Sequence, residues 1–326
     1  MRNFTFKGLF LTAVFMLLGC LSIQAANDDL ITKQITINLD KAGTLPNKIA
    51  SSEMYKITNL KIIGEINGTD WNMIREMAGR DNRGYGTEGK LSVLDLSEAK
   101  IVKGGDSYYP GDNCYTSNDE IGEKAFTDCS RLTSLTLPVG ITSIGYDAFA
   151  YCSGLTSLTL PAGITSIGEY AFSGCSGLTS LTLPAGITSI DKYAFSGCSR
   201  LTSLTLPAGI TSIGEFAFSY CSGLTSIYVY AEKVPRIGRY AFEGCASRKC
   251  TLYVPKGTYD NYRLSEFGYF ENIVEFDPTG IDKTTTSTNV EEVSRYSLNG
   301  QRLAVPVKGL NIVKYSDGTA RKVVVK

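Results

Sequence analysis

Apolar residues recur in a fixed order along the middle of the chain. In the stretch from Cys152 to Phe172, CSGLTSLTLPAGITSIGEYAF, the leucines follow the pattern L-x-x-L-x-L, with a serine before and a threonine after the middle leucine. This alternation predicts a short β-strand whose leucines face a core and whose hydroxyl residues face outward. The following Pro-Ala-Gly ends the strand and permits a turn, I-T-S-I begins a return leg, and E-Y-A-F closes the unit with a helical turn.

Copies of this unit follow one another at a period of 23 residues, with one step of 24 before Cys245. Such a period indicates a solenoid, because one unit cannot bury its own apolar residues whereas stacked units can. We therefore expect an α/β solenoid of 23-residue coils with a parallel sheet, short helical turns and a cap at each end. One cysteine and one phenylalanine per coil would form two internal columns: Cys129, Cys152, Cys175, Cys198, Cys221 and Cys245, and Phe126, Phe149, Phe172, Phe195, Phe218 and Phe242.

The repeated cysteine invites three explanations: disulfides, metal ligands or buried thiols. Neighbouring coils of a parallel sheet lie about 4.8 Å apart, so the spacing alone does not exclude disulfides. Reduced cysteine is a small residue that favours burial, and parallel side chains would fill one corner of each coil. We interpret the column as buried thiols with a structural role. Cys114 and Cys250 lie off the column and are the better candidates for a bridge.

The segments on either side of the repeats predict caps, which a solenoid needs to cover its terminal core and strand edges. Upstream, LKIIG at 60–64 and LSVLDLS at 91–97 predict irregular first coils. Between them, TDWNMIREM predicts a helix capped by Thr69 or Asp70. Downstream, we expect a helix around Tyr259–Phe267.

The beginning of the chain is typical of an export signal. Arg2 and Lys7 precede an apolar run from Leu9 to Ile23, and a signal peptidase site follows at Ala25. LLGC, which ends at Cys20, resembles a lipobox and would instead make that cysteine a lipid anchor, the one predicted link to a membrane. The predicted parts are 1–25 signal peptide, 26–120 N-terminal cap with irregular first coils, 121–256 repeats, 257–278 C-terminal cap, 279–290 linker and 291–326 β-rich C-terminal segment.

Composition argues against several classes of function. The 32 basic and 32 acidic residues cancel, so no net field would draw the chain to nucleic acid. The chain holds no histidine, which removes the usual general base and the commonest metal ligand. The repeated serines have no base beside them, and no glycine-rich phosphate loop is present. We predict no enzyme activity, no catalytic residue, no metal site and no cofactor.

The outward face of the predicted sheet is the candidate binding surface. Its hydroxyl residues are Ser134, Thr136, Ser157, Thr159, Ser180, Thr182, Ser203 and Thr205. At the C-terminal end the threonine column changes to Tyr228 and Tyr253. Aromatic anchors usually dominate binding energy, so these two tyrosines are the strongest candidates for ligand contacts. Covering of the cap is an alternative explanation for them.

The motifs L-x-x-L-x-L-P, I-x-x-I-G and A-F-x-x-C at a 23-residue period closely resemble the BspA-like (treponemal-type) leucine-rich repeat proteins of bacterial surfaces. This resemblance covers about 121–255 and implies a leucine-rich-repeat solenoid on an exported protein. Several such proteins are implicated in adhesion to host proteins or to other bacteria. LNGQRL and GLNIVK…KVVVK, near the end of the chain, resemble the C-terminal sorting domains of the type IX secretion system of Bacteroidetes. Asn299-Gly300 and Asp317-Gly318 predict turns between strands there.

These observations favour an exported or cell-surface, adhesin-like scaffold whose partner is a host extracellular protein or a bacterial surface protein. A carbohydrate-binding accessory protein, with glycan held by the tyrosines and the hydroxyl face, is the first alternative. A purely structural component of the cell envelope is the second. A third is a Ser/Thr grid that orders water, as flat threonine-rich solenoids do when they bind ice.

Overall fold

The computed structural model describes residues 29–109, 111, 113–278, 292–296, 302–303, 305, 309–315 and 320–325. The predicted export signal, with Cys20 and Ala25, lies outside the described residues. So do the predicted linker at 279–290 and both predicted turns, Asn299-Gly300 and Asp317-Gly318.

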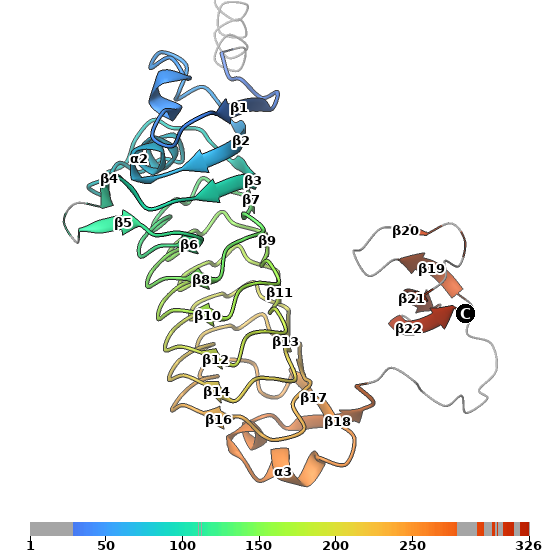
Figure 1. Ribbon diagram of the computed structural model, residues 1–326. Coiled ribbons are helices and arrows are strands. Elements are labelled where there is room, and N and C mark those ends of the chain that lie inside the picture. Colours follow the sequence, from blue (N-terminus) through green and yellow to red (C-terminus); the bar gives the residue numbers. More distant parts are fainter. Residues whose placement is uncertain are drawn as a thin grey trace, which may run out of the picture.

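One strand from each coil joins a ten-stranded sheet, in the order β1-β2-β3-β7-β9-β11-β13-β15-β17-β18, and every pair in it is parallel. Successive coils stack along one axis (Figure 1). This is the predicted leucine-rich-repeat solenoid, and the fold prediction is confirmed. The strands are β1 Ile35–Leu39, β2 Asn59–Ile66, β3 Val93–Ile101, β7 Ser134–Thr136, β9 Ser157–Thr159, β11 Ser180–Thr182, β13 Ser203–Leu206, β15 Ser226–Val229, β17 Thr251–Pro255 and β18 Asn272–Phe276.

The return legs form two further parallel sheets, and the caps and the C-terminal segment add the remaining elements. The return-leg sheets are β10-β8-β6 and β12-β14-β16. Their strands are β6 Glu120–Ile121, β8 Ser143–Ile144, β10 Ser166–Ile167, β12 Ser189–Ile190, β14 Ser212–Ile213 and β16 Arg236–Ile237. The other elements are η1 Leu45–Asn47, α2 Gly68–Met77, β4 Gly104–Tyr109, β5 Cys114–Thr116, α3 Tyr259–Arg263, η3 Glu266–Tyr269, β19 Glu292–Tyr296, β20 Arg302–Leu303, β21 Gly309–Tyr315 and β22 Ala320–Val325.

The phenylalanines form a continuous stack through the core. The Phe172 ring lies 5.0 Å from Phe149 and 5.1 Å from Phe195, each within 4° of parallel. These centroid distances correspond to the offset stacking that aromatic rings prefer. The ring of Trp71 covers the first phenylalanine at 5.2 Å, and Phe270 covers the last at 5.3 Å. The caps therefore close this column at both ends.

The cysteines form a second buried column beside the phenylalanines. Each thiol from Cys152 onward donates to a phenylalanine carbonyl of the coil before; Cys175 Sγ, for example, lies 3.1 Å from Phe149 O. Burial raises the pKa of the Cys175 thiol to about 12, so the group stays neutral at physiological pH. Cys114 and Cys250 are also buried. Cys114 begins β5 and Cys250 directly precedes β17, at opposite ends of the solenoid, so the prediction that they are the better candidates for a bridge is wrong for a bridge between them.

The segment that closes each coil is a run of tight turns, which corrects the expectation of a helical turn. Within it, the Ala171 and Ser173 amides donate to carbonyls three residues back, whereas the intervening Phe172 amide donates to Ala194 O of the next coil at 2.7 Å. Tyr170 has a φ of 56°, in the left-handed region. A right-handed helix cannot run through such a residue. Because every second amide donates to the next coil, the closing segment is hydrogen-bonded to that coil along its whole length.

Asp191 marks a break in the return-leg sheets. Every other unit has glycine at this position, and a Cβ on Gly214 would lie only 2.6 Å from Lys192 N of the preceding coil. Glycine therefore permits the close approach in which the Gly214 amide donates to Ile190 O at 2.8 Å. Asp191 carries a Cβ, and among the described residues no such bond joins it to the coil before. The return-leg sheet is divided between β10 and β12 at this point.

We expect Asp191→Gly to join the two return-leg sheets and to raise the free energy of unfolding by about 1 kcal/mol. New backbone hydrogen bonds, at about 1 kcal/mol each, would outweigh the entropy cost of a glycine. Chemical denaturation measures the gain, and hydrogen exchange should show new protection of the amide at position 191. Asp191→Asn keeps the Cβ and should change neither the free energy of unfolding nor the protection of that amide. An equal gain from asparagine would mean that the charge, rather than the Cβ, separates the coils.

Helix α2 locks the N-terminal cap onto the repeats. Its N-cap is Asn67, whose side chain accepts from Thr69 N at 3.0 Å while Asp70 accepts from the Asn67 amide at 2.9 Å. The prediction of Thr69 or Asp70 as the cap is therefore wrong by two or three residues, because the helix begins at Gly68 and Asp70 completes a reciprocal capping box. Arg75 is fully buried and donates to Lys124 O at 2.8 Å.

The C-terminal cap is a pair of short helical segments. The helix predicted around Tyr259–Phe267 divides into α3 and η3. Tyr262 is buried, and its hydroxyl donates to Ala231 O at 2.6 Å. This bond fastens the cap to the last full repeat. In the C-terminal segment, β19 to β22 form an antiparallel sheet.

Candidate binding surface

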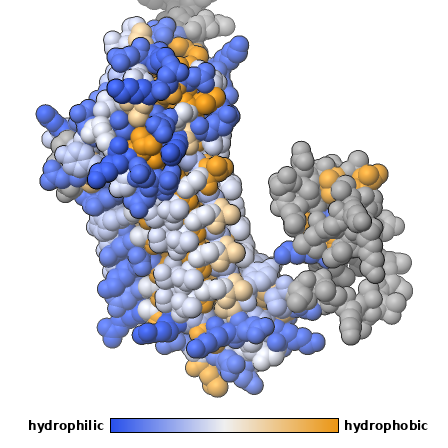
Figure 2. Space-filling model, in the orientation of Figure 1, coloured by the Kyte–Doolittle hydropathy of each residue, from blue (hydrophilic) through white to orange (hydrophobic). Residues whose placement is uncertain are grey.

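The outward face of the ten-stranded sheet carries rows of hydroxyl side chains. Ser134, Ser157 and their equivalents align across neighbouring strands, and so do Thr136 and Thr159. The leucines between them are buried, whereas the hydroxyl residues are exposed or half-buried. All eight predicted hydroxyl positions lie on this one face: Ser134, Thr136, Ser157, Thr159, Ser180, Thr182, Ser203 and Thr205. In Figure 2 the side of the solenoid that faces the viewer, between the ten-stranded sheet and the return legs, is pale and weakly polar, and strongly hydrophilic residues gather at the ends and along the left margin.

The threonine row changes its chemistry at both ends of the sheet. Toward the N-terminal cap, Thr136 aligns with Asp95 and then with Lys61. The Lys61 ammonium lies 3.5 Å from Asp95 and 2.6 Å from Glu98. These charged residues were missed in the sequence, because the strands that carry them lie outside the repeats. The only signal available was the alternation within LSVLDLS.

Toward the C-terminal cap the row becomes aromatic. Thr205 aligns with Tyr228, and Tyr228 aligns with Tyr253. The two tyrosine rings stack at 4.4 Å, within 6° of parallel. Phe276 of β18 meets Tyr228 edge-on at 6.0 Å and Tyr230 at 5.1 Å. We call Tyr228, Tyr230, Tyr253 and Phe276 the aromatic patch.

Every member of the aromatic patch is half-buried, so each ring packs on its neighbours and keeps part of its surface in solvent. Burial, followed by the neighbouring Tyr253, raises the pKa of Tyr228. The phenol is therefore neutral at physiological pH and can both donate and accept a hydrogen bond. Phe276 was missed in the sequence, since β18 belongs to no repeat and no period assigns it to the sheet face. Tyr230 was missed because it occupies the position after the strand that carries a proline in the preceding units, as at Pro207.

The closing turns carry a second aromatic stripe on another side of the coil. Tyr170, Tyr193 and Phe216 stack at 4.7 and 4.9 Å. Their faces cover one another, so mainly their edges remain for contact. Lys192 and Glu215 of neighbouring coils lie 3.5 Å apart beside them. Such an exposed pair contributes little to stability, and the stripe is explained by packing between coils.

The described residues hold no group of three or more histidine, cysteine, aspartate or glutamate side chains arranged to bind a metal ion. Within the same residues, no helix has the length and apolar character needed to cross a membrane.

The repeats match a known family. The BspA type leucine rich repeat region matches residues 119–249 in six copies. Its first repeat begins two residues before the predicted boundary at Ile121. Leucine-rich-repeat solenoids of this family are generally non-catalytic, and typically mediate protein binding. The chain has no match among curated proteins.

The chain is similar to solved structures of bacterial leucine-rich repeat proteins. A leucine rich repeat protein of T. pallidum is 31% identical and has a TM-score of 0.40; the match covers 42% of this chain and 63% of that one. A leucine rich cell surface protein of Faecalibacterium prausnitzii is 24% identical, with a TM-score of 0.39 and coverage of 67% and 51%. A leucine-rich repeat protein of Bacteroides ovatus is 20% identical, with a TM-score of 0.28 and coverage of 59% and 65%. The chain thus spans less than two thirds of each relative's length.

Proposed function

We propose that this chain is an exported, adhesin-like scaffold that binds a protein on a host or on another bacterium through the C-terminal end of its sheet. The aromatic patch is the observation that carries this proposal. Elsewhere the repeat strands present short hydroxyl side chains, which supply few anchors for a partner. Tyr228 and Tyr253 combine an apolar ring with a polar tip, a combination that is enriched at protein interfaces.

The shape of the sheet supports a protein ligand. The hydroxyl rows are flat and bear no long side chains between β7 and β13. A partner surface can therefore approach the strands closely while its central contacts fall on the aromatic patch. Because Tyr228 and Tyr253 stack face to face at 4.4 Å, most of each inner ring face is covered. A sugar, which stacks on an open ring face, has less surface to use there than a protein side chain that contacts ring edges.

Export is the second part of the proposal. The apolar segment from Leu9 to Ile23 supports passage across a membrane, with either cleavage at Ala25 or a lipid anchor at Cys20. The C-terminal segment, with its resemblance to type IX sorting domains, supports delivery to the cell surface or the medium. Mass spectrometry of the protein from its native host distinguishes cleavage at Ala25 from a lipid anchor at Cys20. The intact mass or the N-terminal peptide identifies the residue that was cleaved or lipidated.

We expect the double substitution Tyr228→Thr and Tyr253→Thr to weaken binding of the protein ligand at least about tenfold, as loss of central aromatic contacts typically does. Threonine is the residue that the same row carries at Thr205, so the strand keeps its pairing. The ligand is first found by screening immobilised extracellular-matrix proteins, bacterial cells and a glycan array. Surface plasmon resonance then compares the variant with the wild-type chain.

Tyr151 and Tyr220 provide the matched control. They are 60% and 59% exposed and lie on the closing turns, away from the sheet face. Tyr151→Gly with Tyr220→Gly removes the same number of tyrosines and should leave the affinity unchanged. Both positions have a left-handed φ, near 60°, and the equivalent positions of other coils carry Gly174 and Gly197, so glycine fits the backbone there. Equal losses from both pairs would contradict a site at the aromatic patch. Saturable binding to glycans alone would favour the carbohydrate-binding alternative, and silence in all three screens would favour a structural envelope component.

A further inference from the structure

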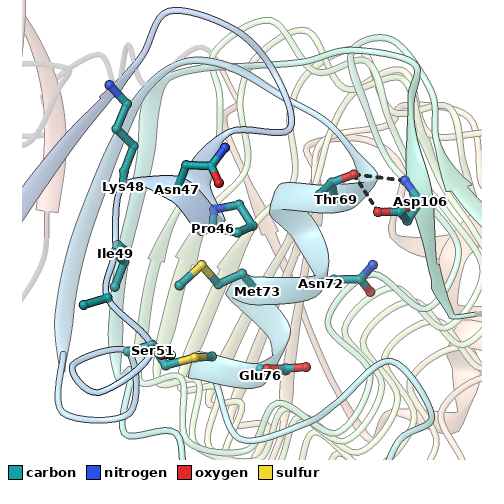
Figure 3. A pocket seen from close by; sticks show the side chains of 12 residues that line it. Pro46, Asn47, Lys48, Ile49, Ser51, Thr69, Asn72, Met73, Glu76 and Asp106 are labelled. Carbon is teal, nitrogen blue, oxygen red and sulfur yellow. Dashed lines mark hydrogen bonds between the residues drawn. The ribbon is translucent and has the colours of Figure 1, made fainter.

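The N-terminal cap contains a pocket of about 740 Å³. None of the residues that line it belongs to the hydroxyl rows or to the aromatic patch. It lies between the loop at 46–54 and helix α2, with Asp106 of β4 at one side (Figure 3). The aromatic patch lies at the opposite end of the solenoid. A ligand of this pocket would therefore contact the chain independently of the function proposed above.

One wall of the pocket is apolar and adaptable. Pro46, Ile49 and Met54 come from the loop, and Met73 comes from α2. Figure 3 shows the Met73 side chain pointing from the helix toward this loop. Methionine is unbranched and polarizable, and it fits flexible aliphatic chains well. This wall suits an unbranched aliphatic stem.

The other wall presents hydrogen-bond acceptors. Thr69, Asn72 and Glu76 follow the i, i+3, i+7 spacing on one face of α2, and their side chains point to the same side of the helix (Figure 3). Thr69 is already satisfied, since its hydroxyl donates to Asp106 Oδ2 at 2.8 Å and accepts from the Asp106 amide at 3.2 Å. Asn72 and Glu76 are not.

Two acceptors on this wall lack a partner. The Oδ1 atom of Asn72 is buried and has no hydrogen-bond partner among the described residues. The Glu76 carboxylate forms no hydrogen bond or ion pair within the same part of the chain, and burial, followed by the charge of Asp81, raises its pKa. Lys48 also lines the pocket, but it points away from α2, and its ammonium lies 3.7 Å from Asp40. A buried acceptor such as Asn72 Oδ1 is normally paired, and the half-buried Glu76 carboxylate has no cation beside it, so the wall is short of donors.

We propose that this pocket binds a basic side chain, lysine or arginine, presented by a protein partner. The aliphatic stem would lie along Met54 and Met73, and the charged head would donate to the half-buried Glu76 carboxylate. A rotation of the Asn72 side chain would bring its Oδ1 atom, which has no contact with solvent in the free chain, to the same head. Lysine and arginine heads carry donors only, which matches a wall of acceptors. Glu76 also lies in the last turn of α2, where the helix dipole favours a positive charge.

Methionine methyl groups report on the pocket directly. Met54 and Met73 line it, whereas Met77 is fully buried outside it and serves as an internal control. The full-length chain, labelled with ¹³C at the methionine methyls, is titrated with four probes: the N-acetyl, N-methylamide derivatives of lysine, arginine, norleucine and glutamate. We expect saturable shifts of Met54 and Met73 with lysine and arginine, at least about tenfold tighter than with norleucine, and no shift of Met77.

Glu76→Gln tests the charged contact and keeps the shape of the side chain. It should weaken lysine and arginine binding about tenfold and leave norleucine binding unchanged. Glu53→Gln is the matched control, because Glu53 is exposed on the same loop but does not line the pocket. Equal binding of norleucine and lysine, binding of glutamate, or the absence of any saturable shift would each overturn the proposal. None of these outcomes depends on Tyr228 or Tyr253.

Discussion

Phe172→Ala should lower the free energy of unfolding by about 3–5 kcal/mol, the range for truncating a buried aromatic ring. The ring has no solvent exposure and stacks on Phe149 and Phe195 at 5.0 and 5.1 Å. Its backbone amide and those two residues to either side, at Tyr170 and Gly174, donate to carbonyls of the next coil, so the coil cannot easily move inward to fill the space. The cavity would therefore remain open, and its cost adds to the lost transfer free energy.

Urea denaturation followed by circular dichroism measures this loss. Phe172→Leu keeps most of the apolar volume and should lose less. Tyr151→Ala removes an aromatic ring of similar size that is 60% exposed, and it should change stability by no more than about 0.5 kcal/mol. A loss below about 1 kcal/mol for Phe172→Ala would show that the coils collapse around the gap, which contradicts the rigid stacking described above.

Arg75→Ala should lower the free energy of unfolding by about 3 kcal/mol, because it leaves buried carbonyls without donors. The guanidinium donates to Lys124 O at 2.8 Å and to Ala125 O at 3.0 Å, where the N-terminal cap meets the first closing turn. It also lies over the Tyr109 ring, 5.3 Å from the centroid. Losing these contacts should detach the cap before the repeats unfold.

The single tryptophan makes this detachment visible. Trp71 is buried in the same cap, one helical turn from Arg75, so its fluorescence should change at a lower urea concentration than the circular dichroism of the repeats. Arg75→Met keeps most of the side-chain volume but has no donors. Its loss of stability therefore measures the contribution of the hydrogen bonds apart from that of packing. Arg83→Ala, at an exposed arginine of the same cap, is the control and should have little effect. Wild-type stability in Arg75→Met would show that the guanidinium bonds contribute no net stability.

The repeat region was predictable because each residue in it packs on its own equivalent. A phenylalanine every 23 residues has to lie in a column once the coils stack, and the same argument places Cys175 and the hydroxyl rows. Departures from the repeat were harder to interpret. Asp191 differs from glycine by a side chain whose effect depends on the distance to the coil before it, and only the structure gives that distance.

The caps were less predictable because nothing in them repeats. The helix in the N-terminal cap was identified, but its cap was assigned to Thr69 or Asp70 in place of Asn67. Asp70 is itself a good capping residue, and the sequence does not show that its carboxylate turns back to the Asn67 amide. The partners of Arg75 lie 49 and 50 residues further along the chain, so no local pattern could reveal them.

Among the described residues, the rings of the caps contact the phenylalanine column only at its first and last members. Trp71 packs on Phe126, while Phe267 and Phe270 pack on Phe242. Insertion or removal of one 23-residue unit between those rings would leave both contacts unchanged and would move the two ends of the molecule by about 4.8 Å, the spacing of neighbouring strands. The length of the molecule can therefore change in equal steps by duplication or loss of a single gene segment, with no second change needed elsewhere in the chain.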